Sequence, residues 1–265
     1  MVRSVNGDER TVTLNWQDAM GVFDPMDEND DKTVLVSRTI TPSAENMPST
    51  AQSIGTDLYY YPLEDAPQTT VVLRPMSLSL WDQEELDETF AQILAMNPEV
   101  LVVDLKDTPG RPGGTMDHVV HLSRQLGVNE PFELKFDAIG DVGGMDDWTQ
   151  GVNSFEHLLN HVPNNPWKGK VVFRINPQTS GEGDFFIRWM KLNDRGLVFG
   201  MPTAGTGSKK MQYLLSNTGT AITIPKMAQT FVNDHQAVEG VGTQPDVYFD
   251  GGIEVFLDGY WDRVY

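Results

Sequence analysis

One serine lies where the sequence can give its hydroxyl group chemical reactivity. Ser180 belongs to the stretch Lys170–Gly207, whose pattern is typical of a buried strand, a turn, a helix, a short strand and a glycine-rich loop. That order places Ser180 at a helix N-terminus, where unpaired backbone N–H groups can stabilise a developing oxyanion. The pattern therefore predicts a nucleophile for acyl transfer, and an ordinary helix N-cap is the alternative role for the same serine.

A second glycine-rich turn supplies candidate oxyanion donors. The apolar run Val100–Leu105 leads into DTPGRPGG, which contains Gly110, Gly113 and Gly114. The carboxyl ends of parallel strands meet at one edge of a sheet, so this turn is expected beside the turn that carries Ser180. Glycine allows the backbone to approach a ligand closely. These glycines are therefore candidates for the N–H groups that bind an oxyanion.

A serine nucleophile needs a base, and the residues leave its identity open. His118 and His121 have i, i+3 spacing on one expected helix, and His157 and His161 have i, i+4 spacing on another. Without an H-E-x-x-H pattern, this spacing favours solvated helix faces over a metal site. Lys209 follows the glycine-rich loop and could act as a base if it were desolvated. No metal ion or cofactor is expected.

The elements around these turns predict an α/β fold. Strands alternate with helices, which implies a mainly parallel sheet with right-handed βαβ crossovers. Asp82 and Glu85 form a capping pair at the start of the first helix, and Gly127 is the expected stop of the second. The expected strands are Val71–Leu73, Val100–Leu105, Val171–Ile175, Leu197–Phe199, Gln212–Leu215, Ala221–Ile224 and Val247–Phe249, and the expected helices are Gln83–Met96, one that contains Met116–Ser123, Trp148–Val162 and Gly183–Lys191.

Two regions of different composition divide the chain. Residues 1–66 are polar, and their short β-like runs predict a β-rich N-terminal extension that includes a hairpin turning at Asn6-Gly7. Residues 67–265 carry the alternating pattern and are expected to form the α/β core. The first residues lack the apolar core of a signal peptide and look like a start placed inside a longer protein.

Charge and composition exclude several classes of function. The formal net charge of the 265 residues is −19, which argues against nucleic acid or an anionic membrane as a partner. The chain has no cysteine, so disulfides and thiol catalysis are absent. No apolar run reaches the roughly 18 residues of a membrane-spanning helix. The pattern says nothing about the oligomeric state.

Five segments, spread between about Val71 and Phe249, resemble the C-terminal processing, or tail-specific, serine peptidases. The likeness is closer to the tricorn-like and retinoid-binding-protein-like branch of that family. The segments are VVLRPMSLS, VLVVDLKDTPGRPGG, VVFRINPQTSGEGDFFIRWMK, DRGLVFGMPTAGTG and VEGVGTQPDVYFD, of which the last is the most distinctive.

This resemblance implies a crotonase/ClpP-like core, often attached to a peptide-binding PDZ domain, so the N-terminal extension would be a remnant of such a region. It implies hydrolysis of peptide bonds in a peptide or protein substrate. Ser180 matches the nucleophile, and Gly110 and Gly181 match the oxyanion positions. Together with the acidic composition, the resemblance implies a periplasmic or secreted protein.

The chain departs from the family pattern at the base. Thr206 occupies the position of the lysine base in the tail-specific branch, and Lys209 follows three residues later. The tricorn-type branch uses an N-terminal histidine supported by a glutamate, which Glu239 matches. The histidine has no counterpart before His118, so the base is either Lys209 or a residue outside this chain.

The nucleophile turn also departs from the pattern. Counting back from the helix puts Gly181 in register with the nucleophile, unless one residue is inserted, and the acidic partner on the helix is either Glu182 or Asp184. These departures leave a rival hypothesis open, in which the chain is a catalytically degenerate module that binds peptides or apolar ligands.

Overall fold

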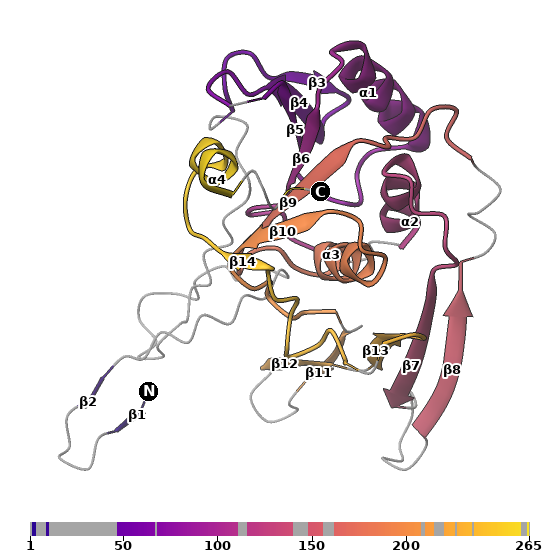
Figure 1. Ribbon diagram of the computed structural model, residues 1–265. Coiled ribbons are helices and arrows are strands. Elements are labelled where there is room, and N and C mark those ends of the chain that lie inside the picture. The colour runs from indigo at the N-terminus through magenta and orange to yellow at the C-terminus, as the bar shows by residue number, and fades with distance from the viewer. Residues whose placement is uncertain are drawn as a thin grey trace.

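A seven-stranded sheet forms the centre of the computed structural model (Figure 1). The structure describes residues 2–3, 9–10, 47–66, 68–110, 116–139, 148–155, 162–207, 210–214, 220–225, 227–234, 236–260 and 264. The strand order is β14-β10-β9-β6-β5-β4-β3; the first five strands run parallel, and β4 and β3 are antiparallel to their neighbours. The strands are β3 (Gln52–Ile54), β4 (Leu58–Pro62), β5 (Thr70–Pro75), β6 (Val100–Asp104), β9 (Lys170–Ile175), β10 (Leu197–Gly200) and β14 (Val247–Tyr248).

Helices cover both faces of this sheet, as Figure 1 shows. α1 (Gln83–Ala95), α2 (Met116–Gln125) and α3 (Glu182–Leu192) lie on one face, and α4 (Ile253–Tyr260) lies on the other. Alternate side chains of β6 serve the two resulting cores, because Leu101 and Val103 pack on the α1–α3 side and Val100 and Val102 on the α4 side. α1 begins at the predicted capping box of Asp82 and Glu85. The predicted α/β class is therefore confirmed.

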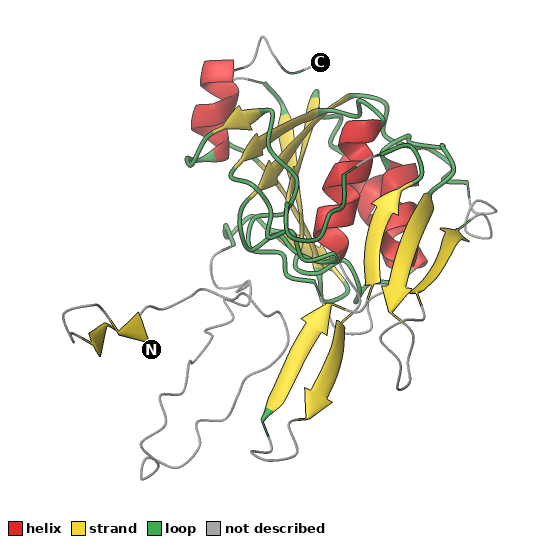
Figure 2. Ribbon diagram, turned by 90° about the horizontal axis from the view of Figure 1, so that it is seen from below, coloured by secondary structure: helices red, strands yellow, loops and turns green. Residues whose placement is uncertain are grey.

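The described residues also form three smaller sheets (Figure 2). They are the three-stranded sheet β13-β7-β8 and the pairs β11-β12 and β1-β2. Their strands are β1 (Val2–Arg3), β2 (Glu9–Arg10), β7 (Glu133–Ile139), β8 (Trp148–Ser154), β11 (Lys210–Leu214), β12 (Ala221–Pro225) and β13 (Met227–Phe231). β1 and β2 are antiparallel, as the predicted N-terminal hairpin requires.

The helix predicted over Trp148–Val162 is wrong. Its first half is strand β8, which pairs antiparallel with β7 along seven residues. Gly151 lies opposite Phe136, and a Cβ atom on this glycine would lie 2.5 Å from the phenyl ring, so the missing side chain makes room for the ring. Val152, one residue of the expected apolar stripe, is 56% exposed. Cross-strand packing overrides the helical spacing here.

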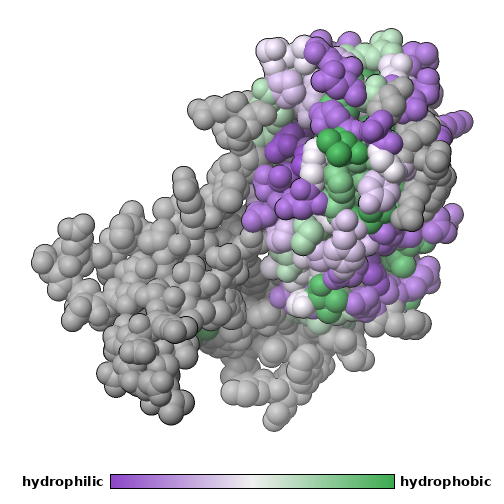
Figure 3. Space-filling view, turned by 60° about the vertical axis from the view of Figure 1, so that its left-hand side comes forward, coloured by the Kyte–Doolittle hydropathy of each residue, from purple (hydrophilic) through white to green (hydrophobic). Residues whose placement is uncertain are grey.

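The extension and the core share one sheet. β3 and β4 fall within residues 1–66, yet β4 hydrogen-bonds to β5 of the core. Most of residues 1–46 lies outside the described part, so the division at residue 66 stays a prediction. Among the described residues, no helix is both long and apolar enough to cross a bilayer. On the face drawn in Figure 3, hydrophobic residues form small patches among hydrophilic ones.

Candidate active site

Ser180 and Gly110 meet at the carboxyl edge of the main sheet. Ser180 follows β9 and is 5% exposed, and its Oγ accepts a hydrogen bond of 2.8 Å from the backbone N–H of Gly110. The backbone N–H of Ser180 donates to Thr108 O at 3.2 Å. The two turns expected at one edge therefore do lie together, although they are 70 residues apart in sequence.

Gly181 occupies the strained position of the turn. It is the N-cap of α3 with φ 57° and ψ −119°, and no side chain caps this helix. The alternative interpretation of Ser180 as an ordinary N-cap is therefore wrong. A Cβ atom on Gly181 would lie 2.7 Å from Gly110 Cα, so the approach of the two backbones requires glycine. In the nucleophile elbow of α/β-hydrolases the serine itself holds the strained position, whereas here glycine holds it.

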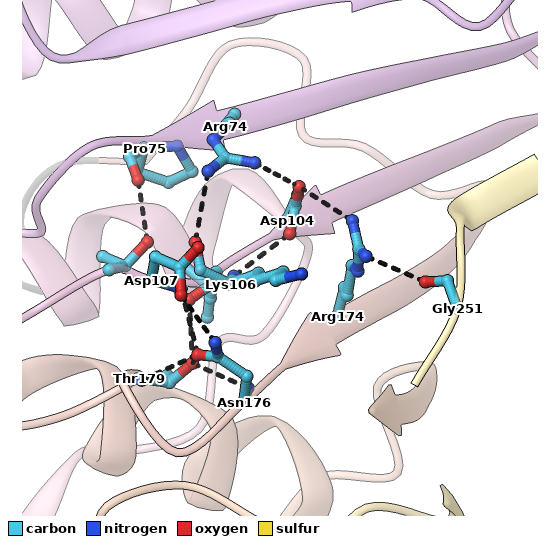
Figure 4. Close-up of polar contacts among 11 residues, drawn as sticks. Arg74, Pro75, Asp104, Lys106, Asp107, Arg174, Asn176, Thr179 and Gly251 are labelled. Carbon is cyan, nitrogen blue, oxygen red and sulfur yellow. Dashed lines mark hydrogen bonds and ion pairs between the residues drawn. The ribbon is translucent and has the colours of Figure 1, made fainter. Parts of the chain in front are cut away.

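Asn176 fastens the two turns to each other, as Figure 4 shows. Its side-chain oxygen accepts a 3.0 Å hydrogen bond from Asp107 N, and its Nδ2 donates to Asp107 Oδ1 at 2.6 Å. Thr179 Oγ1 adds a 2.8 Å bond to Leu105 O. Each turn thus satisfies polar groups of the other, which fixes Ser180 against Gly110. Asn176 was not among the residues expected at the site, although the Asn-Pro dipeptide is a turn signal.

A row of charged side chains on the sheet supports the turn that leads from β6 to Gly110 (Figure 4). Asp104 is completely buried, and its Oδ2 lies 2.8 Å from Arg74 Nη1 and 3.7 Å from Arg174 Nη1. Asp104 Oδ1 accepts a 3.0 Å hydrogen bond from Lys106 N, at the start of the turn that leads to Gly110. Arg174 also donates to Gly251 O at 2.8 Å, at the entrance to α4. The buried charge is thus compensated, and the row anchors the turn.

Asp184 holds the glycine-rich loop against α3. This fully buried carboxylate accepts hydrogen bonds from Thr206 N at 3.0 Å, from Gly205 N at 3.3 Å and from the hydroxyl of Thr203. Burial raises the pKa of the Asp184 carboxyl to about 6; the three hydrogen bonds oppose the rise, and the charge of Glu239 adds to it. Of the two acidic residues expected on this helix, Asp184 therefore holds the loop through three hydrogen bonds.

Thr206 completes the contacts between the loop and the turn. Its Oγ1 accepts a 3.3 Å hydrogen bond from Gly181 N. The carboxylate of Glu182 also lies beside the turn, where its Oε2 would be 3.1 Å from a Cβ atom on Gly110. Both backbone N–H groups predicted as oxyanion donors, those of Gly110 and Gly181, are thus close together and bonded to hydroxyl groups of the chain.

The candidate base, the glutamate expected to support it and the histidines have different outcomes. Glu239 is brought to the loop side of the site, because its charge acts on Asp184 and its neighbour Gly240 donates a 2.7 Å bond to Gly205 O. Lys209, His157 and His161 lie outside the described residues, as do Gly113 and Gly114. His118 is described, and its Nε2 lies 2.8 Å from Trp81 O rather than at Ser180.

Comparison with known proteins decides the family. The model of peptidase family S41 matches residues 71–249, which is more than half of the chain. The chain belongs to peptidase family S41. The match covers both glycine turns, the loop and Glu239, so the predicted resemblance is confirmed. No curated protein sequence matches this family member.

Solved structures share the fold of this S41 chain at low sequence identity. A presumed peptidase from Parabacteroides merdae has 20% identity and a TM-score of 0.60, with 80% of this chain and 62% of that chain covered. The photosystem II D1 C-terminal processing protease has 18% identity and a TM-score of 0.51, covering 74% and 48%. Mature CPAF complexed with lactacystin has 17% identity and a TM-score of 0.54, covering 81% and 56%. The S41 chain thus spans about half to two thirds of the length of these proteins.

Proposed function

We propose that this chain is the core domain of a serine-type peptidase that hydrolyses peptide bonds by acyl transfer. One observation carries the proposal: the buried Oγ of Ser180 lies 2.8 Å from Gly110 N, beside the N-terminus of α3. A hydroxyl group in this position is close to two backbone N–H groups and to the positive end of a helix dipole. Membership of peptidase family S41 supports the same reaction class.

In the proposed reaction, Ser180 Oγ attacks the carbonyl carbon of the scissile peptide and passes its proton to a base. Oγ gives up the Gly110 N–H as it moves toward the carbon, and this N–H then binds the new oxyanion together with Gly181 N–H. Collapse of the tetrahedral intermediate releases the amine, which takes up the proton, and water then hydrolyses the acyl-enzyme. Lys209 or a residue outside this chain serves as the base, and Glu239 orients it.

Labelling with a fluorophosphonate probe tests the proposal. The probe phosphonylates a serine, with loss of fluoride, only where a base and oxyanion donors activate the hydroxyl group, so we expect one label, on Ser180, in the full-length protein. The Ser180→Ala variant is the control and should take up no label. Unlabelled full-length protein, with Ser180 intact and the fold verified by circular dichroism, would refute hydrolysis at this site.

A second candidate function is a peptide-binding module on the same scaffold. The observation in its favour is that Gly181, which has no side chain, holds the strained position of the turn. Protein that stays unlabelled but binds extended peptides would support the module, and labelled protein would support the peptidase. A peptide or protein partner is common to both functions. The periplasmic or secreted location expected from the sequence stays a prediction.

A further inference from the structure

The N–H groups of Gly110 and Gly181 form one small donor site. A Cβ atom built on Gly110 would lie 3.1 Å from Gly181 N, and one built on Gly181 would lie 3.6 Å from Gly110 N. The two amides therefore come from backbones in contact. In the resting protein each amide already has an acceptor, Ser180 Oγ for Gly110 and Thr206 Oγ1 for Gly181.

Thr206 is held in this position by its own backbone. Its N–H and the N–H of Gly205 donate to Asp184, which lies in the first turn of α3, directly after Gly181. Gly205 O in turn accepts from Gly240 N at 2.7 Å, which ties the loop to the segment that carries Glu239. The loop is therefore fixed to the same helix as the donor site, and the Thr206 hydroxyl faces Gly181 N–H without any need for a ligand.

We propose that Thr206 competes with the substrate carbonyl for the Gly181 N–H, and so sets how tightly the site binds peptides and reacting carbonyls. The inference rests on the proposed function, since it assumes that a carbonyl oxygen enters this donor site. It applies to the peptidase and to the binding module alike. Thr206 is thus a competing acceptor and takes no part in proton transfer.

The geometry limits the size of the effect. The bond from Gly181 N to Thr206 Oγ1 is 3.3 Å long, against 2.8 Å for the bond from Gly110 N to Ser180 Oγ, so the Thr206 contact is the weaker of the two and is displaced first. The net free-energy contribution of an ordinary hydrogen bond corresponds to a change of about 2- to 10-fold in an equilibrium or rate constant. Removing the competing hydroxyl should therefore speed reaction with an oxyanion-forming probe by about that factor.

Two variants separate the hydroxyl group from the space it fills. Thr206→Ala removes the hydroxyl, whereas Thr206→Ser keeps it and loses only the methyl group. We expect the fluorophosphonate labelling rate of Thr206→Ala to rise about 2- to 10-fold and that of Thr206→Ser to stay within about 2-fold of the wild type. Where the wild type is labelled, an equal rise in both variants, or no rise in Thr206→Ala, would overturn the proposal.

A second readout keeps this test separate from that of the peptidase. In 1H–15N spectra of the full chain, the Gly181 amide resonance should shift in Thr206→Ala and stay close to its wild-type position in Thr206→Ser. If no variant is labelled but this shift appears, the peptidase proposal fails and the Thr206 contact stands. If labelling occurs but the Gly181 resonance is the same in all three proteins, the Thr206 proposal fails and the peptidase stands.

Discussion

Replacing Asp184 with asparagine should change how the stability of the protein depends on pH. The substitution keeps the shape of the side chain but removes its ionisation. Asp184 is completely buried in the first turn of α3, and burial raises its pKa from the usual 3.8 to about 6. The folded protein therefore keeps the proton over a pH range in which the unfolded chain has already lost it.

The sign of the effect follows from this proton balance. Between about pH 4 and pH 6 the unfolded chain carries fewer protons on this group than the folded protein, so raising the pH favours unfolding. The contribution of Asp184 to the free energy of unfolding is fully present below about pH 4 and is lost as the pH passes 6. Each pKa unit is worth about 1.4 kcal/mol, so the rise of roughly two units amounts to about 3 kcal/mol, half of it lost by about pH 5.

Urea unfolding of the wild type and Asp184→Asn at pH 4, 5, 6 and 7 measures this contribution. The free energy of unfolding of the wild type, minus that of the variant, should fall by about 3 kcal/mol across the range. Because many other carboxyl groups titrate in both proteins, only this difference is informative. The same substitution at the exposed Asp65 controls for the loss of one negative charge. A difference that stays constant from pH 4 to pH 7 would refute the reasoning.

Two further predictions use matched pairs of variants, and urea unfolding checks both. Gly181→Ala should destabilise the fold by about 1–3 kcal/mol more than Gly240→Ala, since both glycines have positive φ but only Gly181 has backbone within 2.7 Å of the new Cβ; equal losses would contradict the contact with Gly110. Asp104→Asn should cost about 3–5 kcal/mol, because it leaves two arginines without a buried counter-charge. Lys191→Met breaks a partly exposed ion pair and should cost less than about 1 kcal/mol; similar losses in both variants would refute the role of Asp104.

Local signals predicted the central elements of the fold well. The capping pair before α1, the continuous apolar run of β6 and the amphipathic stretch of α3 agree with the structure. The helix prediction over the residues of β8 was wrong because this strand depends on its partner. Gly151 accommodates Phe136 of β7, and the spacing of apolar residues along the sequence does not show that contact. α4 was missed since its eight residues are too short for a periodic pattern to stand out.

The site shows the same division between local and distant information. The rule that parallel strands end at one edge predicted the meeting of Ser180 with Gly110, because that rule needs only the order of the elements. The contacts of Asn176 and Thr206 could not be predicted in this way. Each joins segments 25 or more residues apart through a single side chain, and the sequence shows the residue type without its partner.

The occupied N–H groups suit the resting state of a peptidase and that of a binding module alike. A buried or half-buried amide without an acceptor is costly, so a site built from the Gly110 and Gly181 amides needs acceptors whenever no ligand is bound. Ser180 and Thr206 supply them, and either function would require such a resting state. What differs is the next step: hydrolysis requires Ser180 Oγ to leave Gly110 N–H and reach a base, whereas binding requires only that a ligand replace the hydroxyl groups. A labelling rate therefore separates the two functions, and a binding constant does not.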